Sequence, residues 1–173
     1  CRMLAPKLST LSAERIWREL RRILLGPNPE DVITLLRGER ILEHILPETG
    51  PVGRLRVLNW LETRAINVES VKPDPIRRLA AILETDLAGV EDIAHRLRLS
   101  NQEARRLRNI TAPAFTVSLE LSTREMKQLL YNQNAEVVRD VLLLTWAQEF
   151  STAETRGRDQ TNAWLEHLAY IDA

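Results

Sequence analysis

Three arginines near the start of the chain, Arg15, Arg18 and Arg22, follow one another at i, i+3 and i+7. On an α-helix this spacing places the three guanidinium groups on one face. A row of such cations can neutralise successive phosphates of a nucleic-acid backbone, and the planar guanidinium suits phosphate oxygens. Lys7 adds a further cation upstream. The pattern predicts a phosphate-binding face, while a solvated helix face stays open as the alternative.

A second basic cluster in the middle of the chain consists of Arg96, Arg98, Arg105, Arg106 and Arg108. We take Arg105 and Arg106 as further candidates for contact with RNA phosphates. The segment 92–107 also resembles a helix-turn-helix, in which one helix would enter a DNA groove. Any two short antiparallel helices would have the same spacing, however, and Arg98 stands where such turns usually have glycine. Sequence-specific DNA binding therefore stays open as an alternative.

The residues that most enzymes use are absent or scattered. The six glycines form no phosphate-binding loop, and the three histidines, His44, His95 and His167, are far apart and form no H-E-x-x-H pattern. No Asp-x-Asp pair is present that could hold two magnesium ions for nucleotidyl transfer. The single cysteine, Cys1, excludes internal disulfides, and no Cys/His group has zinc-ligand spacing. The sequence predicts no catalytic residue and no metal ligand in this chain.

The composition is that of a globular protein, with 44% hydrophobic and 28% charged residues and a formal net charge of zero. The longest apolar runs, such as 141–144, are far too short to cross a bilayer, and residues 1–6 lack the apolar stretch of a signal peptide. We therefore expect a cytoplasmic protein with no membrane partner. Because the chain begins with cysteine rather than methionine, we also expect it to be a piece of a longer protein.

Helix signals recur along the whole chain and predict an all-α fold with at least eight helices. After a possible cap at Ser12, Ile16, Leu20, Ile23 and Leu24 form an apolar stripe that should be buried beneath the arginine row. Ser100 and Ser122 each begin a capping-box pattern with glutamate three residues later. The predicted helices lie at about 12–24, 29–38, 41–46, 52–66, 74–83, 89–97, from 100, from 122, 135–150 and 160–170.

Two segments bear on how these helices are organised. Glu48-Thr49-Gly50-Pro51 is the main cluster of helix-breaking residues, so we place a boundary between two helical subdomains of an irregular bundle there. Only residues 115–119 alternate as a strand would, and one isolated strand cannot form a sheet.

One stretch carries a residue pattern that helical periodicity alone does not require. Residues 11–20 contain Ser12-Ala13-Glu14-Arg15-Ile16-Trp17-Arg18-Glu19-Leu20. This segment resembles the Ser-x-Glu-Arg-Ile-x-x-Glu-Leu pattern that follows the catalytic head of bacterial tRNA nucleotidyltransferases (CCA-adding enzymes) and their poly(A) polymerase relatives. The segment 41–48, ending in Leu46-Pro47-Glu48, resembles the family's Leu-Leu-Pro-Glu-like sequence. The segments 77–83 and 96–100 are similar to its helical body.

The resemblance implies a chain that holds RNA beside a catalytic head. The head's Gly-Gly, Asp-x-Asp and Glu-Asp-x-x-Arg motifs do not occur here. The implied partners are therefore tRNA or another RNA 3′ end and the head of the same parent chain. Magnesium and ATP or CTP would belong to that head, and this chain would need no cofactor. Glu84-Thr85-Asp86 stands where some relatives have His-Asp metal ligands, so no phosphohydrolase activity is implied.

The resemblance also implies an arrangement of parts. Residues 1–48 would form a neck-like helical RNA-binding subdomain, 49–150 a helical body, and 151–173 the start of a truncated C-terminal tail. We expect the chain alone to be inactive in nucleotide incorporation, and the parent enzyme could add either CCA or poly(A). A helix-turn-helix DNA-binding regulator and a non-catalytic protein-interaction module stay open as alternatives.

Overall fold

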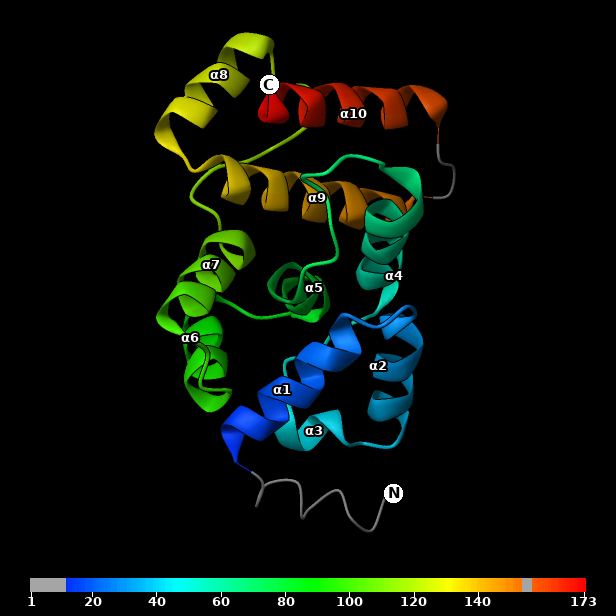
Figure 1. Cartoon of the computed structure of the whole chain (residues 1–173), viewed down its shortest axis with the longest axis vertical. Helices are drawn as coiled ribbons and strands as arrows, with labels where there is room; N and C mark the ends of the chain where they lie inside the picture. The colour runs from blue at the N-terminus through cyan, green and yellow to red at the C-terminus, as the bar shows by residue number, and fades with distance from the viewer. Residues whose placement is uncertain (1–11, 154–156) are drawn as a thin grey trace.

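In the computed structural model, residues 12–153 and 157–173 are described, and they form ten α-helices and one π-helical turn (Figure 1). The elements are α1 (Ala13–Leu24), α2 (Pro29–Gly38), α3 (Leu42–Ile45), α4 (Gly53–Trp60), the π turn η2 (Leu61–Ala65), α5 (Pro75–Ile82), α6 (Leu87–Arg96), α7 (Asn101–Thr111), α8 (Thr123–Asn132), α9 (Ala135–Thr152) and α10 (Arg158–Asp172). No strand occurs in the described residues, and Thr49 and Leu83 form an isolated bridge. The all-α prediction and the expectation of at least eight helices are confirmed.

The predicted helix starts are built as the sequence indicates. The Ser12 hydroxyl accepts from the Arg15 amide at 3.3 Å and caps α1. Ser100 and Ser122 each form a complete capping box with the glutamate three residues later, at the starts of α7 and α8. Each box satisfies two backbone donors that a helix start would otherwise leave free.

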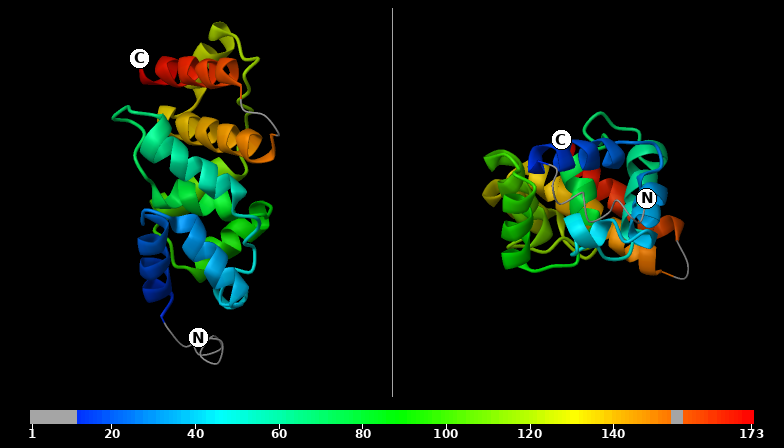
Figure 2. Two further views of the ribbon diagram at one scale, coloured as in Figure 1. Left: turned by 90° about the vertical axis from the view of Figure 1, so that its right-hand side faces the viewer. Right: turned by 90° about the horizontal axis from the view of Figure 1, so that it is seen from below.

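The helix α5 lies at the centre of the molecule, in contact with α1, α4, α7 and α9 (Figure 1). All of its residues from Ile76 to Ile82 are buried. The most extensive helix pair is α4 with α9. Seen from two sides, α1, α2 and α3 occupy one end of the molecule and α8 and α10 the other (Figure 2). One hydrophobic cluster runs through the interior, from Trp17 in α1 to Ile171 in α10.

The segment expected to be a boundary is bonded to the connection between α5 and α6. The Gly50 amide donates to the Ile82 carbonyl at 2.8 Å, and the Glu84 amide donates to the Glu48 carbonyl at 2.9 Å. Arg96 of α6 also donates to the Glu48 carboxylate at 2.9 Å. The division of the chain at residue 48 and the tail beginning at residue 151 stay predictions.

The Glu48–Arg96 pair predicts a measurable dependence of stability on acid. The hydrogen bond from Arg96 holds the pKa of the Glu48 carboxyl below its ordinary value of 4.5. A carboxylate with a depressed folded-state pKa contributes stability above its unfolded pKa and loses it as pH falls through the folded pKa. Glu48→Gln should therefore lower the free energy of unfolding most at about pH 7, and the difference from the unaltered chain should shrink towards about pH 3. Urea denaturation at both pH values measures it.

The matched control for this prediction is Glu43→Gln in α3. Glu43 lies 3.8 Å from Arg40, with both side chains largely exposed. Exposed pairs of this kind contribute little to stability. A Glu48→Gln effect that is equal at both pH values, or no larger than the Glu43→Gln effect, would contradict the prediction.

The alternating segment 115–119 belongs to the irregular connection between α7 and α8. Val117 is buried, and Phe115 and Leu119 pack against the core cluster. The alternation therefore reflects a segment with one buried side, without a partner strand in the described part of the chain. Among those residues no helix is long and apolar enough to span a membrane.

Candidate nucleic-acid interface

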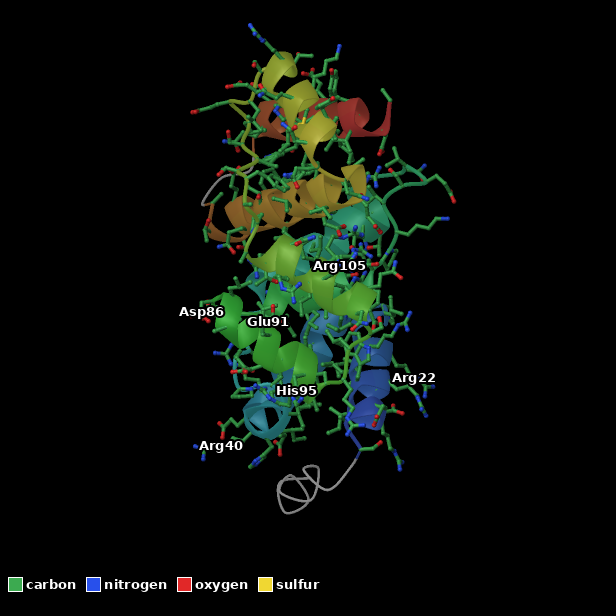
Figure 3. The ribbon with its side chains drawn as sticks, turned by 90° about the vertical axis from the view of Figure 1, so that its left-hand side faces the viewer. Arg22, Arg40, Asp86, Glu91, His95 and Arg105 are labelled. Atoms are coloured by element: carbon green, nitrogen blue, oxygen red, sulfur yellow. The ribbon has the colours of Figure 1, made fainter. Side chains whose placement is uncertain are left out.

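The α1 helix presents the predicted row of guanidinium groups. Arg15, Arg18 and Arg22 are exposed, and Arg21 beside them is exposed as well. Among the described residues, none of these four side chains has an ion-pair or hydrogen-bond partner. Figure 3 shows Arg22 projecting outward from α1. The Arg15–Glu19 ion pair that this spacing allows does not form, so Arg15 is available to a ligand.

The buried side of α1 differs in part from the sequence expectation. Leu20 and Leu24 are buried as predicted, but Ile16 and Ile23 are only half-buried. Trp17 takes the third buried position. The i, i+3, i+7 face that carries Trp17, Leu20 and Leu24 turns inward because it holds the largest apolar side chain of the helix.

The body of the protein holds α1 at both ends. Near the start of the helix, Glu14 accepts from Arg98 at 2.9 Å and the Trp17 Nε1–H donates to Glu103 at 3.4 Å. At its end, the Arg78 Nη1 donates to the Leu24 carbonyl at 2.6 Å and to the Gly26 carbonyl at 3.2 Å. Helix-end carbonyls have no partner within the helix, so a buried cation there satisfies them. These contacts therefore hold the helix that carries the exposed arginines.

Arg78 belongs to a buried network of charges beneath the row. Its Nε lies 2.6 Å from one Glu62 oxygen, and Arg77 lies 2.6 Å from the other. Arg77 also pairs with Asp140 at 2.8 Å. Burial opposes ionisation of Arg77, but Glu62 and Asp140 hold its pKa above the ordinary value. The network links α5 to η2 and α9.

The second basic cluster is not a free basic surface, because four of its five arginines pair with acids. Arg96 pairs with Glu48, Arg98 with Glu14, Arg108 with Glu91, and Arg106 with Asp74, Glu136 and Asp140. Burial works against the charge of Arg106, yet its three carboxylate partners hold its pKa above the ordinary value.

The two candidates of this cluster therefore differ. Arg105 is exposed on α7, without a partner in the described residues (Figure 3). Arg106 is largely buried, and its guanidinium is occupied by the carboxylates of Asp74 and Asp140. Lys7, the remaining candidate, lies outside the described residues. The structure thus brings Arg15, Arg18 and Arg22 together on one face, with Arg105 on a separate helix.

The pair α6 and α7 has the form of a helix-turn-helix, and its turn has a backbone conformation that commonly ends helices. Arg98 adopts a left-handed backbone with φ of 50°. Its amide donates to the His95 carbonyl, and the Leu99 amide donates to the Ala94 carbonyl. These two bonds form a Schellman motif, which commonly ends a helix and usually has glycine at the left-handed position. The turn therefore does not by itself indicate DNA recognition.

Possible metal ligands among the described residues do not gather into one group. No group of three or more His, Cys, Asp or Glu side chains lies close enough together there to hold a metal ion. Asp86 caps α6 by accepting from the Gly89 amide at 2.9 Å.

Three residues outside the predicted set form a further group. Arg56, Trp60 and Arg64 line one hollow beside the α1–α2 turn. Their spacing of i, i+4 and i+8 was a signal in the sequence, but it gave no reason to expect an exposed tryptophan between the two cations.

Comparison with known protein families gives a match at the start of the chain. Residues 1–51 match the family described as the probable RNA and SrmB-binding site of polymerase A. No curated protein matches the chain. The matched residues include α1, α2 and α3, and thus the whole arginine row. The match supports an RNA-binding region of the kind found in the poly(A) polymerase and CCA-adding family.

Proposed function

We propose that this chain is the RNA-holding region of a template-independent nucleotidyltransferase that extends RNA 3′ ends by CCA or poly(A) addition, with its catalytic head in another part of the parent chain. The observation that carries the proposal is the exposed row of Arg15, Arg18 and Arg22, which lies within the segment matched to the polymerase A RNA-binding family. Among the described residues these cations have no acidic partner, unlike most arginines of the second cluster.

The row suits a folded RNA better than a small anion. Arg15 to Arg22 spans about two helical turns, or roughly 10 Å, which can bridge neighbouring phosphates. Contacts of this kind position an RNA by its backbone and shape rather than by its sequence. Since α1 is held by its buried Trp17 and by the bonds from Arg78 to the carbonyls at its end, the row can hold the RNA in one orientation while its 3′ end is extended elsewhere.

A protein-interaction role is the second candidate, favoured by an apolar groove beside the row. The groove lies between α1, α2 and α3 and is lined mainly by Ile16, Ile23, Leu36, Ile41 and Ile45. Leu35 on α2 is 64% exposed nearby. Exposed apolar surfaces with a polar rim are typical of sites that bind another protein.

Binding of the 173-residue chain to labelled tRNA and to duplex DNA, at two salt concentrations, tests the proposal. We expect tighter binding to tRNA, with log K falling against log salt by roughly two to three units per decade, as three or four phosphate contacts require. A clear preference for duplex DNA would instead favour a helix-turn-helix regulator. No binding to either nucleic acid would reject the proposal and leave the protein-interaction role.

A further inference from the structure

An aromatic side chain between two cations lines a hollow that is separate from the arginine row. The hollow has a volume of about 280 Å³ and is lined by residues of α4, η2 and the start of α2. Trp60 lies at its side, with Arg56 one helical turn before it and Arg64 four residues after it. In Figure 2 (left), α4 lies on the outside of the molecule, above α1 and α2.

Trp60 is unusual among the tryptophans of this chain. Trp17, Trp146 and Trp164 are buried, whereas Trp60 is 37% exposed. Arg56 and Arg64 are exposed as well, and neither has a carboxylate partner in the described part of the chain. An exposed indole flanked by two unpaired guanidinium groups offers a stacking surface and positive charge together, which suits a ligand with an aromatic ring and negative charge.

The π turn explains why these three side chains share one side. In η2 the Ile66 amide donates to the Leu61 carbonyl, five residues back, so this turn is wider than an α-helical turn. The wider turn rotates less per residue and brings Arg64 back towards the side of Arg56 and Trp60. Glu62 of this turn is buried, and its carboxylate accepts from Arg77 and Arg78 of α5.

The floor of the hollow, which we define as the buried lining residue Asn59, is held by hydrogen bonds. The Asn59 side-chain amide donates to the Pro27 carbonyl at 3.0 Å and to Glu30 at 3.1 Å, and its oxygen accepts from Arg78 at 2.8 Å. Both polar atoms of the Asn59 side chain are thus bonded within the protein, one of them to Arg78 of the buried network. Glu30 is the acid among the lining residues, and with two arginines opposite it the hollow keeps a net positive charge.

We propose that this hollow binds one unpaired nucleotide of RNA, whose base stacks on the Trp60 indole while the adjoining phosphates contact Arg56 and Arg64. Stacking on an exposed aromatic ring and neutralisation of backbone charge are the two contacts that single-stranded RNA-binding sites combine. The inference deepens the proposed function and rests on it. The α1–α2 turn, which contributes Asn28 to the hollow, connects it to the end of the arginine row. The proposal is that an unpaired segment of an RNA held along α1 reaches the hollow.

The experiment compares the 173-residue chain and its variants on two probes, a single-stranded RNA oligonucleotide and a fully paired RNA hairpin. Trp60→Leu should weaken binding of the single strand roughly five- to hundred-fold, the range that loss of one stacked base produces, and leave the hairpin unchanged. Trp60→Phe, which keeps a stacking ring, should retain most of the affinity. Arg56→Ala/Arg64→Ala should lower the salt slope for the single strand by roughly one to one and a half units.

A crosslinking measurement does not depend on how the variants fold. A single-stranded RNA containing 5-iodouracil should crosslink to the peptide that holds Trp60 in the unaltered chain. Equal affinities of Trp60→Leu and the unaltered chain for the single strand, equal losses on both probes, or crosslinks confined to other peptides would overturn the inference. Failure of the unaltered chain to bind either RNA would reject the proposed function itself. Only this inference would be rejected if hairpin binding depends on α1 and Trp60→Leu leaves the affinity for the single strand unchanged.

Discussion

Replacing Arg15, Arg18 and Arg22 together by alanine should weaken tRNA binding roughly ten- to hundred-fold at moderate salt and flatten its salt dependence by two to three units of slope. Each phosphate contact releases a counterion, so the loss in slope counts the contacts that the row makes. The row is exposed and has no acidic partner among the described residues, so these charges are fully available to RNA. Fluorescence anisotropy with labelled tRNA over a salt series measures both quantities.

A charge-matched pair of variants separates a local site from general electrostatics. Arg18→Ala/Arg22→Ala removes two cations of the row, and Arg124→Ala/Lys127→Ala removes two exposed cations of α8, at the other end of the molecule (Figure 1). We expect the first variant to lose several times more affinity than the second. Thermal unfolding should be nearly unchanged in both, because surface substitutions of this kind alter stability by about 0.5 kcal/mol or less. Equal losses from both variants would remove the α1 face from the binding site.

Arg78→Met is the substitution with the largest expected effect on stability, a loss of about 3–5 kcal/mol. Arg78 is fully buried, and its guanidinium donates to Glu62, to the Asn59 side chain and to two carbonyls at the end of α1. Methionine fills similar space but removes the donor to the two carbonyls, to the Asn59 oxygen and to one Glu62 oxygen, in a region closed to water. Chemical denaturation of the 173-residue chain measures the change in the free energy of unfolding.

The same substitution at an exposed arginine is the control. Arg98 pairs with Glu14 at 2.9 Å, with side chains that are 69% and 51% exposed. An exposed pair contributes about 0–1 kcal/mol, so Arg98→Met should have a small effect on unfolding. Losses of similar size from Arg78→Met and Arg98→Met would show that the buried network is not what holds α1 and α5 together.

The buried network supports both proposed RNA contacts, the arginine row on α1 and the hollow at Trp60. Arg78 supports the end of α1, and through Asn59 and Glu62 it supports the floor of the hollow and the π turn. A substitution at Arg78 should therefore weaken binding of both paired and single-stranded RNA, even in molecules that stay folded. Substitutions at Trp60 should affect the single strand alone.

Local features of this chain were readable from the sequence because they depend on neighbours within a few residues. The capping boxes at Ser100 and Ser122 formed as predicted, since each needs only the residues of its own first helical turn. The Pro29 and Pro75 starts of α2 and α5 follow from the same local chemistry. The shared exposed face of Arg15, Arg18 and Arg22 was also predictable, because helical periodicity alone determines which residues of α1 lie together.

The pairing of charges was decided only by the tertiary structure. The acids that neutralise the second cluster lie 17 to 84 residues from their arginines along the chain, as in the pairs Arg108–Glu91 and Arg98–Glu14. No spacing rule connects residues so far apart, so the cluster looked free in the sequence. Adjacent residues of a helix point about 100° apart, so Arg105 and Arg106 face different surroundings. Arg106 meets Asp140, and Arg105 stays exposed, because of where α9 packs.

The hollow at Trp60 also depends on contacts between residues far apart in the sequence. Arg56, Trp60 and Arg64 have helical spacing, but a plain α-helix would carry Arg64 steadily away from Arg56 around the axis. The π turn reduces this rotation, and its Glu62 is bound on the inner side by Arg77 and Arg78 of another helix. The sequence by itself determined the helices, their caps and the charged face of α1 through short-range chemistry. Which charges are buried, paired or left free for a ligand was decided by long-range packing, because only packing sets the distance between residues on different helices.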